Sequence, residues 1–147
     1  MSDLNIEKRT QATILQLMET AAHLERRLDR ALSATRGVSF SEYRLLSALS
    51  KVPGNGIPRI DLANAVGLTA SAVTRALKPL EKIGLVTTQK SERDARQSLA
   101  VLTPAGLDLL DDAQGVLRDM FKRLFINTLS ENEIADFQSR LSEIRLF

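Results

Sequence analysis

The chain has 147 residues, 44% of them hydrophobic and 26% charged, and its net charge is +2. This balance is typical of a globular domain of ordinary size with a real core. The absence of cysteine excludes a disulfide scaffold, a zinc-thiolate site and a thiol redox switch.

The chain shows no targeting or membrane signal. Residues 1–9 lack the apolar stretch of a signal peptide. No apolar run approaches the ~18 residues needed to span a bilayer. We therefore expect a cytoplasmic protein that does not contact a membrane.

Charge is unevenly distributed along the chain. Residues 40–103 carry nine Lys and Arg against five Asp and Glu, whereas residues 104–147 carry five against eight. A basic centre beside an acidic tail favours a nucleic-acid-binding core with a separate non-binding segment. An ordinary solvated surface would produce the same difference.

The first predicted helix covers residues 6–33 and ends before Gly37. Its apolar residues recur at spacings of three and four, which makes one stripe. The stripe consists of Ile14, Leu17, Ala21, Leu24, Leu28 and Ala31. This helix is long for so small a domain, so we expect part of the stripe to face a partner.

A capping box formed by Ser39 and Glu42 predicts the start of the second helix. The Pro-Gly-Asn-Gly sequence at 53–56 predicts the loop that ends it. Its predicted inward residues are Tyr43, Leu46 and Leu49.

The next segment has the pattern of a helix-turn-helix. Pro58 suits the first turn of a helix that runs to about Val66, and Gly67 supplies a turn residue with positive φ. Ala63 is small enough for a close helix crossing, and Thr69 is the expected N-cap of the following helix. The apolar residues expected to bury the crossing are Leu62, Val66, Leu68, Val73 and Ala76. An ordinary corner between two helices has the same packing needs.

The helix after Thr69 has two distinct faces. Its predicted buried stripe is Val73, Ala76, Leu77, Leu80 and Ile83. The opposite face carries hydroxyls and cations, namely Ser71, Arg75, Lys78 and Lys82, with Thr74 beside them. Such groups donate to guanine edges or phosphates, although a solvated helix face carries them too. Pro79 removes one helical hydrogen bond and predicts a bend near residues 75–79.

A charged hairpin follows. Residues 85–90 and 98–102 read as short strands, and residues 91–97 form the connecting loop. An arginine at a loop tip suits the negative potential of a narrow minor groove. Asp94 can pair with Arg96 and fix the loop. A purely solvated hairpin is the alternative.

Two further helices complete the pattern. Thr103 and Pro104 signal the start of the first, and a second capping box, Ser130 to Glu133, signals the last. Their apolar positions are Leu110, Ala113, Leu117, Met120 and Leu124, then Ile134, Phe137, Leu141 and Ile144. Together with the first helix they offer more apolar surface than a small winged domain needs. This predicts a homodimer, with a monomeric bundle as the alternative.

These elements predict a mainly α fold with a small β-wing, that is, a winged helix-turn-helix plus a helical dimerisation region. Residues 1–147 would form one domain. Residues 38–103 would be its DNA-binding lobe, and residues 4–36 and 104–147 its dimerisation region.

The chain resembles the MarR (multiple antibiotic resistance regulator) family of bacterial transcription regulators over nearly its whole length. The resemblance rests on motifs in a fixed order: Leu80-Glu-Lys-Ile-Gly-Leu-Val86, Asp94-x-Arg96, Leu102-Thr-Pro-Ala-Gly106 and Leu129-Ser-Glu-Asn-Glu133. It implies a homodimer, with recognition helices in successive major grooves of a pseudo-palindromic operator and each wing arginine in a minor groove. Arg96 would be that arginine and Asp94 its support. The DNA-binding residues expected from the pattern and the resemblance are Thr69, Ser71, Thr74, Arg75, Lys78, Lys90, Arg93, Asp94 and Arg96.

The resemblance also implies a repressor released by a small, often aromatic, anionic effector. The residues we consider for that site are His23, Phe40, Tyr43 and Arg44. His23 also suits a surface or packing position, and Phe40 and Tyr43 also suit the core. The sequence does not identify the effector or show that one exists.

Other functional classes fit less well. The chain offers no nucleophile–base pair, metal cluster or phosphate loop, so we expect neither an enzyme nor a cofactor. A winged helix used for protein–protein contact, as a scaffold or antirepressor, would carry an acidic or apolar outer face on helix 69–83. A non-specific architectural DNA binder would show steep salt dependence with little sequence preference.

Overall fold

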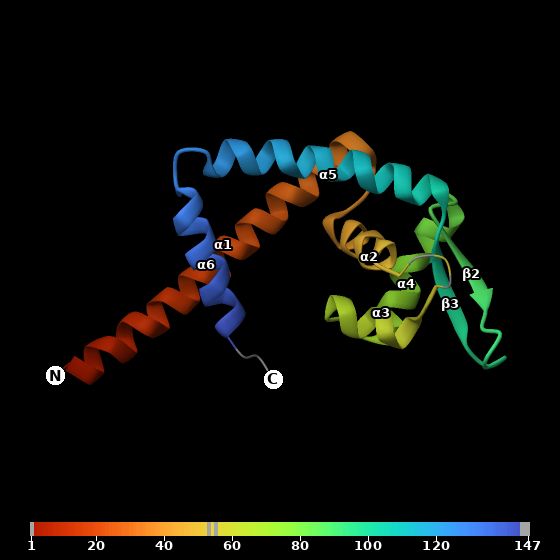
Figure 1. The fold of residues 1–147 in the computed structure, drawn as a ribbon, viewed down its shortest axis with the longest axis horizontal. Coiled ribbons are helices and arrows are strands. Elements are labelled where there is room, and N and C mark those ends of the chain that lie inside the picture. The colour runs from red at the N-terminus through yellow and green to blue at the C-terminus, as the bar shows by residue number, and fades with distance from the viewer. Residues whose placement is uncertain (1, 53, 55, 145–147) are drawn as a thin grey trace. The chain divides into compact units, whose positions relative to one another are not determined.

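The computed structural model describes residues 2–52, 54 and 56–144, and it is mainly helical with one small antiparallel sheet, as predicted (Figure 1). Its elements are α1 Ser2–Arg36, α2 Phe40–Ser50, β1 Ile57–Pro58, α3 Arg59–Val66, α4 Ala70–Lys82, β2 Val86–Lys90, β3 Ser98–Leu102, α5 Pro104–Phe125 and α6 Glu131–Glu143. The chain divides into two compact units, residues 1–113 and 114–147, and the boundary falls within α5. In the described residues, no helix combines the length and apolar character needed to cross a bilayer.

Helix α1 is longer than predicted but ends where expected. Gly37 has φ +70°, and its N–H donates to the Ser33 carbonyl at 3.2 Å. Within unit 1, Leu28 and Leu32 near the C-terminal end of α1 are buried, whereas Ile14 is 43% exposed. The apolar stripe is therefore fully buried only toward its C-terminal end, while Leu17 and Leu24 are half-buried.

The predicted capping box of α2 is present. The Glu42 N–H donates to Ser39 Oγ at 3.0 Å, and the Ser39 N–H donates to Glu42 Oε2 at 2.8 Å. The next backbone amide, that of Phe40, donates to Asp29 Oδ1 on α1 at 2.9 Å. This bond ties the start of α2 to α1. The predicted inward residues of α2 are buried at Leu46 and Leu49 and half-buried at Tyr43, and Leu45 is buried as well.

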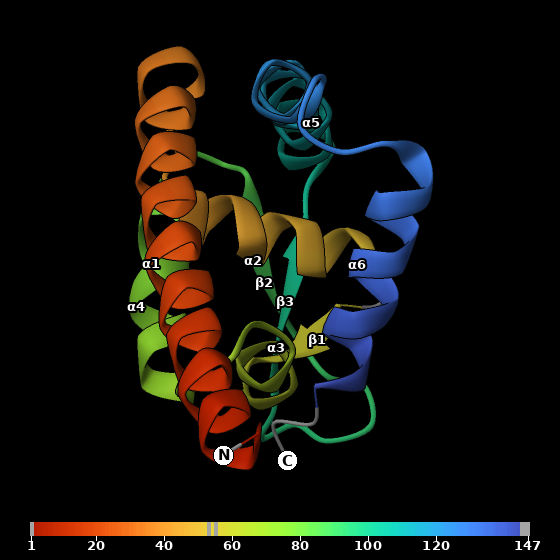
Figure 2. The ribbon, with the colours of Figure 1, turned by 90° about the vertical axis from the view of Figure 1, so that its left-hand side faces the viewer.

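The sheet has the order β1-β3-β2, and all pairs are antiparallel. Strand β1 was not predicted: Ile57 pairs with Ala100 and Pro58 with Leu99. Pro58 therefore ends a short strand and stands at the N-cap position of α3. Figure 2 shows β1 beside α3. Glycine is required at Gly56, because its φ is +72° and an added Cβ would lie 2.7 Å from Val101 Cγ2.

The core of unit 1 lies among α2, α3, α4 and the sheet, with contributions from α1 and the start of α5. Its largest fully buried side chains are Leu32, Val38, Leu45, Leu46, Leu62, Val73, Leu77, Leu80 and Leu110. Helix α5 begins as predicted, because Thr103 Oγ1 accepts from the Gly106 N–H at 3.0 Å. The same hydroxyl donates to the Gly84 carbonyl at 2.6 Å and joins α5 to the segment after α4.

Unit 2 contains the rest of α5 and all of α6. The second capping box is also present, with the Ser130 N–H donating to Glu133 Oε2 at 2.7 Å. These hydrogen bonds lower the pKa of the Glu133 carboxyl. No residue of α6 is buried, and its predicted apolar face is exposed by 41–50% at Ile134, Phe137 and Leu141, and by 44% at the C-cap Ile144.

Candidate nucleic-acid interface

A tight turn joins α3 to α4 as the sequence predicts. Gly67 adopts φ +70°, and the N–H groups of Gly67 and Leu68 both donate to the Ala63 carbonyl. Thr69 then caps α4 by accepting from the Ala72 N–H at 3.2 Å. Ala63 of α3 is buried, and α3 and α4 pack against each other. The segment is therefore a helix-turn-helix.

The buried face of α4 differs from the predicted stripe at its end. Val73, Leu77 and Leu80 are buried, but Ile83 is 60% exposed, so its predicted burial is wrong. The helix ends at Lys82, and beyond that point the helical period no longer sets which residue faces inward. Leu85 takes the buried place instead, and its N–H donates to the Leu80 carbonyl.

One prediction in the turn is also wrong. Leu68 was expected to bury the crossing but is 39% exposed. It lies between the two helices, outside both, so neither helical face carries it inward. Ala76 is half-buried.

The opposite face of α4 is polar and open. Ser71, Arg75 and Lys78 are exposed. Thr74 is half-buried, and its hydroxyl donates to the Ala70 carbonyl at 2.9 Å, which leaves its oxygen free to accept but not to donate elsewhere. Pro79 lies inside a helix that continues to Lys82.

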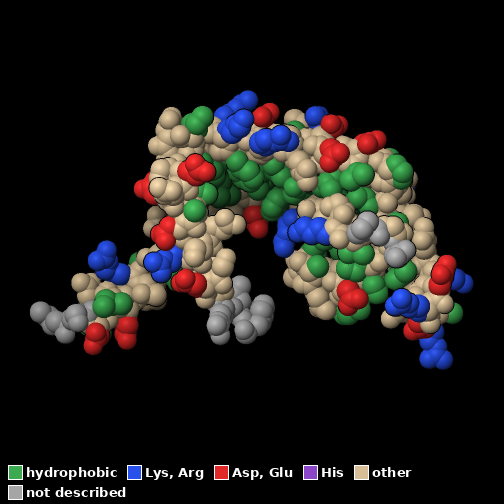
Figure 3. Space-filling model, viewed as in Figure 1, with side chains coloured by type: hydrophobic (Ala, Val, Ile, Leu, Met, Phe, Trp, Pro, Cys, Tyr) green, Lys and Arg blue, Asp and Glu red, His purple; other side chains and the backbone are tan. Residues whose placement is uncertain are grey.

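Strands β2 and β3 with residues 91–97 form a hairpin, called the wing below. Its register runs from Val86 opposite Leu102 to Lys90 opposite Ser98. In Figure 3, Lys and Arg side chains (blue) stand at the free end of the hairpin with acidic side chains close by. The exposed cations of this region are Lys90, Arg93 and Arg96.

The wing loop is ordered by its own polar side chains. Ser91 Oγ accepts from the N–H groups of Arg93 and Asp94 at 3.2 and 3.3 Å. Asp94 Oδ1 accepts from the Arg96 N–H at 2.9 Å. Asp94 was expected to pair with Arg96, and it does hold that residue, but through the backbone amide. The Arg96 guanidinium is therefore left exposed at the wing.

Sequence reasoning missed a polar cluster between α3, α4 and the wing, called the Arg59 cluster below. Arg59 Nη2 donates to Glu81 Oε1 at 3.1 Å and to Thr88 Oγ1 at 2.9 Å. The Thr88 hydroxyl also donates to Glu81 Oε1. These residues are 7 to 29 positions apart in the chain, and no periodic pattern connects them.

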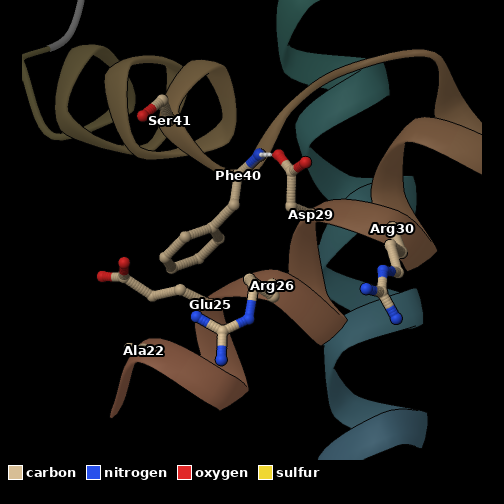
Figure 4. A pocket seen from close by; sticks show the side chains of 7 residues that line it. All are labelled: Ala22, Glu25, Arg26, Asp29, Arg30, Phe40 and Ser41. Atoms are coloured by element: carbon tan, nitrogen blue, oxygen red, sulfur yellow. Dashed lines mark hydrogen bonds between the residues drawn. The ribbon is translucent and has the colours of Figure 1, made fainter. Parts of the chain in front are cut away.

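The four residues considered for an effector lie in different places. Phe40 lines a hollow of about 350 Å³ in unit 1, shown in Figure 4 with Arg26 and Arg30 of α1. Tyr43 and Arg44 line a separate hollow of about 170 Å³. His23 lines neither, and its Nδ1 is 2.7 Å from Arg26 Nη2.

Tyr43 and Arg44 are each held by contacts with nearby residues. The Tyr43 ring stacks on Phe40 with centroids 6.0 Å apart. Burial raises the pKa of the Tyr43 hydroxyl, and a hydrogen bond with Ser47 partly opposes this rise. Arg44 donates to the Val66 carbonyl at 2.9 Å and so satisfies the end of α3.

The helix-turn-helix and the wing define the class: this is a winged helix-turn-helix protein. A sequence model of the MarR family matches residues 36–97. The chain is also 31% identical over 98 residues to YdgJ, an uncharacterized HTH-type transcriptional regulator of Bacillus subtilis (strain 168). That match covers 67% of this chain and 58% of YdgJ, so it spans less than two thirds of the relative.

Solved structures agree with this class. Sco3205, a MarR family transcriptional regulator from Streptomyces coelicolor solved in complex with DNA, is 27% identical with a TM-score of 0.80; the match covers 90% of this chain and 82% of Sco3205. The transcriptional regulator BldR from Sulfolobus solfataricus is 28% identical with a TM-score of 0.74, covering 90% and 96% of the two chains. The matching sequence model and the similar solved structures are thus those of MarR family transcriptional regulators.

Proposed function

We propose that this protein is a sequence-specific DNA-binding transcriptional regulator. The observation that carries the proposal is the exposed face of α4, where Ser71, Arg75 and Lys78 stand open while the one acid of the helix, Glu81, is paired with Arg59. This face suits a major groove, since arginine, lysine and serine donate to base edges and phosphates. An acidic or apolar face, as a protein-contact module would need, is not what α4 presents.

The wing supplies the second part of the proposed interface. Arg96 is exposed, and its backbone is held by Asp94. An exposed arginine on an ordered loop suits the negative potential of a minor groove. The relative Sco3205 has been solved in complex with DNA, which supports the same use of the fold here.

The proposed active form is a homodimer that represses transcription on a pseudo-palindromic operator. Each of the two units carries exposed apolar helix surface, such as Ile14 on α1 and Phe137 on α6. A second copy would cover these surfaces and place two α4 helices on two half-sites.

The proposed repressor is released by a small aromatic anion. Support comes from the Phe40 hollow, where the cations Arg26 and Arg30 lie beside an aromatic ring. The acids Glu25 and Asp29 line it as well, and Asp29 Oδ1 accepts from the Phe40 N–H. We would titrate benzoate and larger aromatic carboxylates into the protein–DNA complex. Release by one of them, lost in Arg30→Ala, would support this part. Failure of the whole series would contradict it.

The first experiment is fluorescence anisotropy on DNA from upstream of the protein's own gene, with scrambled DNA of equal length as control. At ~150 mM salt, near physiological ionic strength, a specific regulator prefers its operator by a factor of ~1,000 or more. Equal binding to both would indicate an architectural protein. Absence of binding to any duplex, including a genomic library, would favour a protein-contact module.

A further inference from the structure

The Arg59 cluster connects the three elements that shape the proposed DNA-binding surface. Arg59 begins α3, Glu81 lies in the last turn of α4, and Thr88 stands in the middle of β2. All three side chains contact one another through Arg59 Nη2, Glu81 Oε1 and Thr88 Oγ1. Among the described residues, these are the side-chain hydrogen bonds that join α4 to the wing.

The exposure and hydrogen bonding of the cluster suggest that its ion pair adds little to the stability of the fold. The Arg59 and Glu81 side chains are 20% and 30% exposed, so solvent partly screens their attraction. Arg59 Nε is buried without a hydrogen-bond partner, which has a desolvation cost. A charge pair with such a cost is weak evidence for net stability, and its role is better sought in the arrangement that the pair holds.

That arrangement bears on two properties of the surface. Through Thr88 and Glu81 the cluster ties β2 to the last turn of α4, and the cations at the far end of the wing follow β2 in the chain. It also neutralises Glu81, which would otherwise repel a phosphate close to Lys78 and Lys82.

We propose that Arg59 is a positioning residue that, through Glu81 and Thr88, holds the wing at the angle at which α4 and Arg96 engage one DNA duplex together. This rests on the proposed DNA-binding function. Arg59 need not contact DNA; its effect is exerted through Arg96.

The test is a double-mutant cycle between the cluster and Arg96, measured as operator affinity. In the parent, Arg96→Ala should weaken binding about tenfold and make the salt dependence shallower by about one unit of slope. In an Arg59→Ala background the wing is already misplaced, so Arg96→Ala should cost only about twofold and leave the slope unchanged.

A second variant separates geometry from charge. Thr88→Val removes the hydroxyl that joins the wing to the cluster, but it keeps the Arg59–Glu81 ion pair and a residue with good strand propensity. In a Thr88→Val background, as in the Arg59→Ala background, Arg96→Ala should cost less operator affinity than it does in the unsubstituted protein. Arg36→Ala is the matched control, because it removes an equal charge that pairs with Asp112 instead. The control should leave the effect of Arg96→Ala at its parental size.

The outcomes are distinct. In one outcome the unsubstituted protein prefers its operator, but the fold-losses in affinity from Arg96→Ala and from Arg59→Ala or Thr88→Val simply multiply. That outcome overturns the positioning role and leaves the proposed function standing. If the parent binds no duplex, both are overturned. Amide hydrogen exchange of β2 in the free protein should be faster in Thr88→Val than in the parent; unchanged exchange would also contradict the inference.

Discussion

At the scale of single residues, Arg75 offers the most direct test of whether α4 reads the base sequence of DNA. It stands on the open face of α4, four positions after Ser71 and opposite the buried Val73 and Leu77. Arg75→Ala should reduce discrimination between operator and mismatched sites by about 1–3 kcal/mol for a lost base contact. Competition binding with single-base operator variants would measure this. A uniform loss across all sequences would mean that Arg75 contacts phosphate only.

Arg96 should behave differently because it lies on the wing. Its substitution by alanine should weaken binding on all duplexes and reduce the slope of log K against log salt by about one. Anisotropy between low and physiological salt would give the slope. A steep slope unchanged from the parent would show that the Arg96 guanidinium makes no DNA contact.

Some positions in the candidate site could be predicted from the sequence, and others could not. The polar face of α4 follows from helical spacing, and Ser71, Arg75 and Lys78 are exposed as that spacing predicts. The Arg59 cluster could not be predicted, because its three members meet only when α3, α4 and β2 pack together. Which of the exposed residues contact DNA stays a prediction.

At the scale of elements, two glycines of α5 make a matched pair. At Gly106 a Cβ would collide with the Leu85 carbonyl oxygen and lie 2.6 Å from Leu102 Cδ1. At Gly115 nothing lies within 4 Å of an added Cβ. Gly106→Ala should therefore lower the free energy of unfolding by roughly 1–3 kcal/mol through overpacking. Gly115→Ala should raise it by about 0.5–1 kcal/mol, since alanine is the better helix former.

Urea denaturation followed by circular dichroism would measure both changes. If Gly106→Ala were as stable as the parent, the close approach of α5 to the segment after α4 would be wrong. Loss of stability in Gly115→Ala would indicate that a neighbouring chain occupies the space beside it.

Local chemistry explains which element boundaries were predictable. The capping boxes at Ser39 and Ser130 and the turn at Gly67 depend on residues within a few positions, so sequence shows them directly. Strand β1 is only two residues long and exists because it pairs with β3, some forty positions away. The predicted burial of Ile83 was wrong because the helical period was continued past Lys82, where the helix ends.

At the scale of the whole molecule, the exposed apolar face of α6 is the surface through which the proposed dimer can be tested. Phe137 is 50% exposed on this face, between Ile134 and Leu141. Burying such a face against a second copy would be worth roughly 25 cal/mol per Å² of apolar surface. Phe137→Glu places a charge at its centre and should convert the protein to monomers, as measured by sedimentation equilibrium. A charge on the interface of a dimer is costly because it loses water without gaining a partner.

The same helix offers the control. Ser139 lies two positions after Phe137, on the opposite side of α6, so Ser139→Glu adds the same charge away from the apolar face. The proposal expects Ser139→Glu to stay dimeric with normal operator affinity. It expects Phe137→Glu to lose affinity for the full operator and to keep weak binding to a half-site, because α4 and the wing belong to the other unit. If both variants stay dimeric, the copies do not meet through this face of α6; if the parent itself is a monomer, two-site recognition by a dimer is wrong.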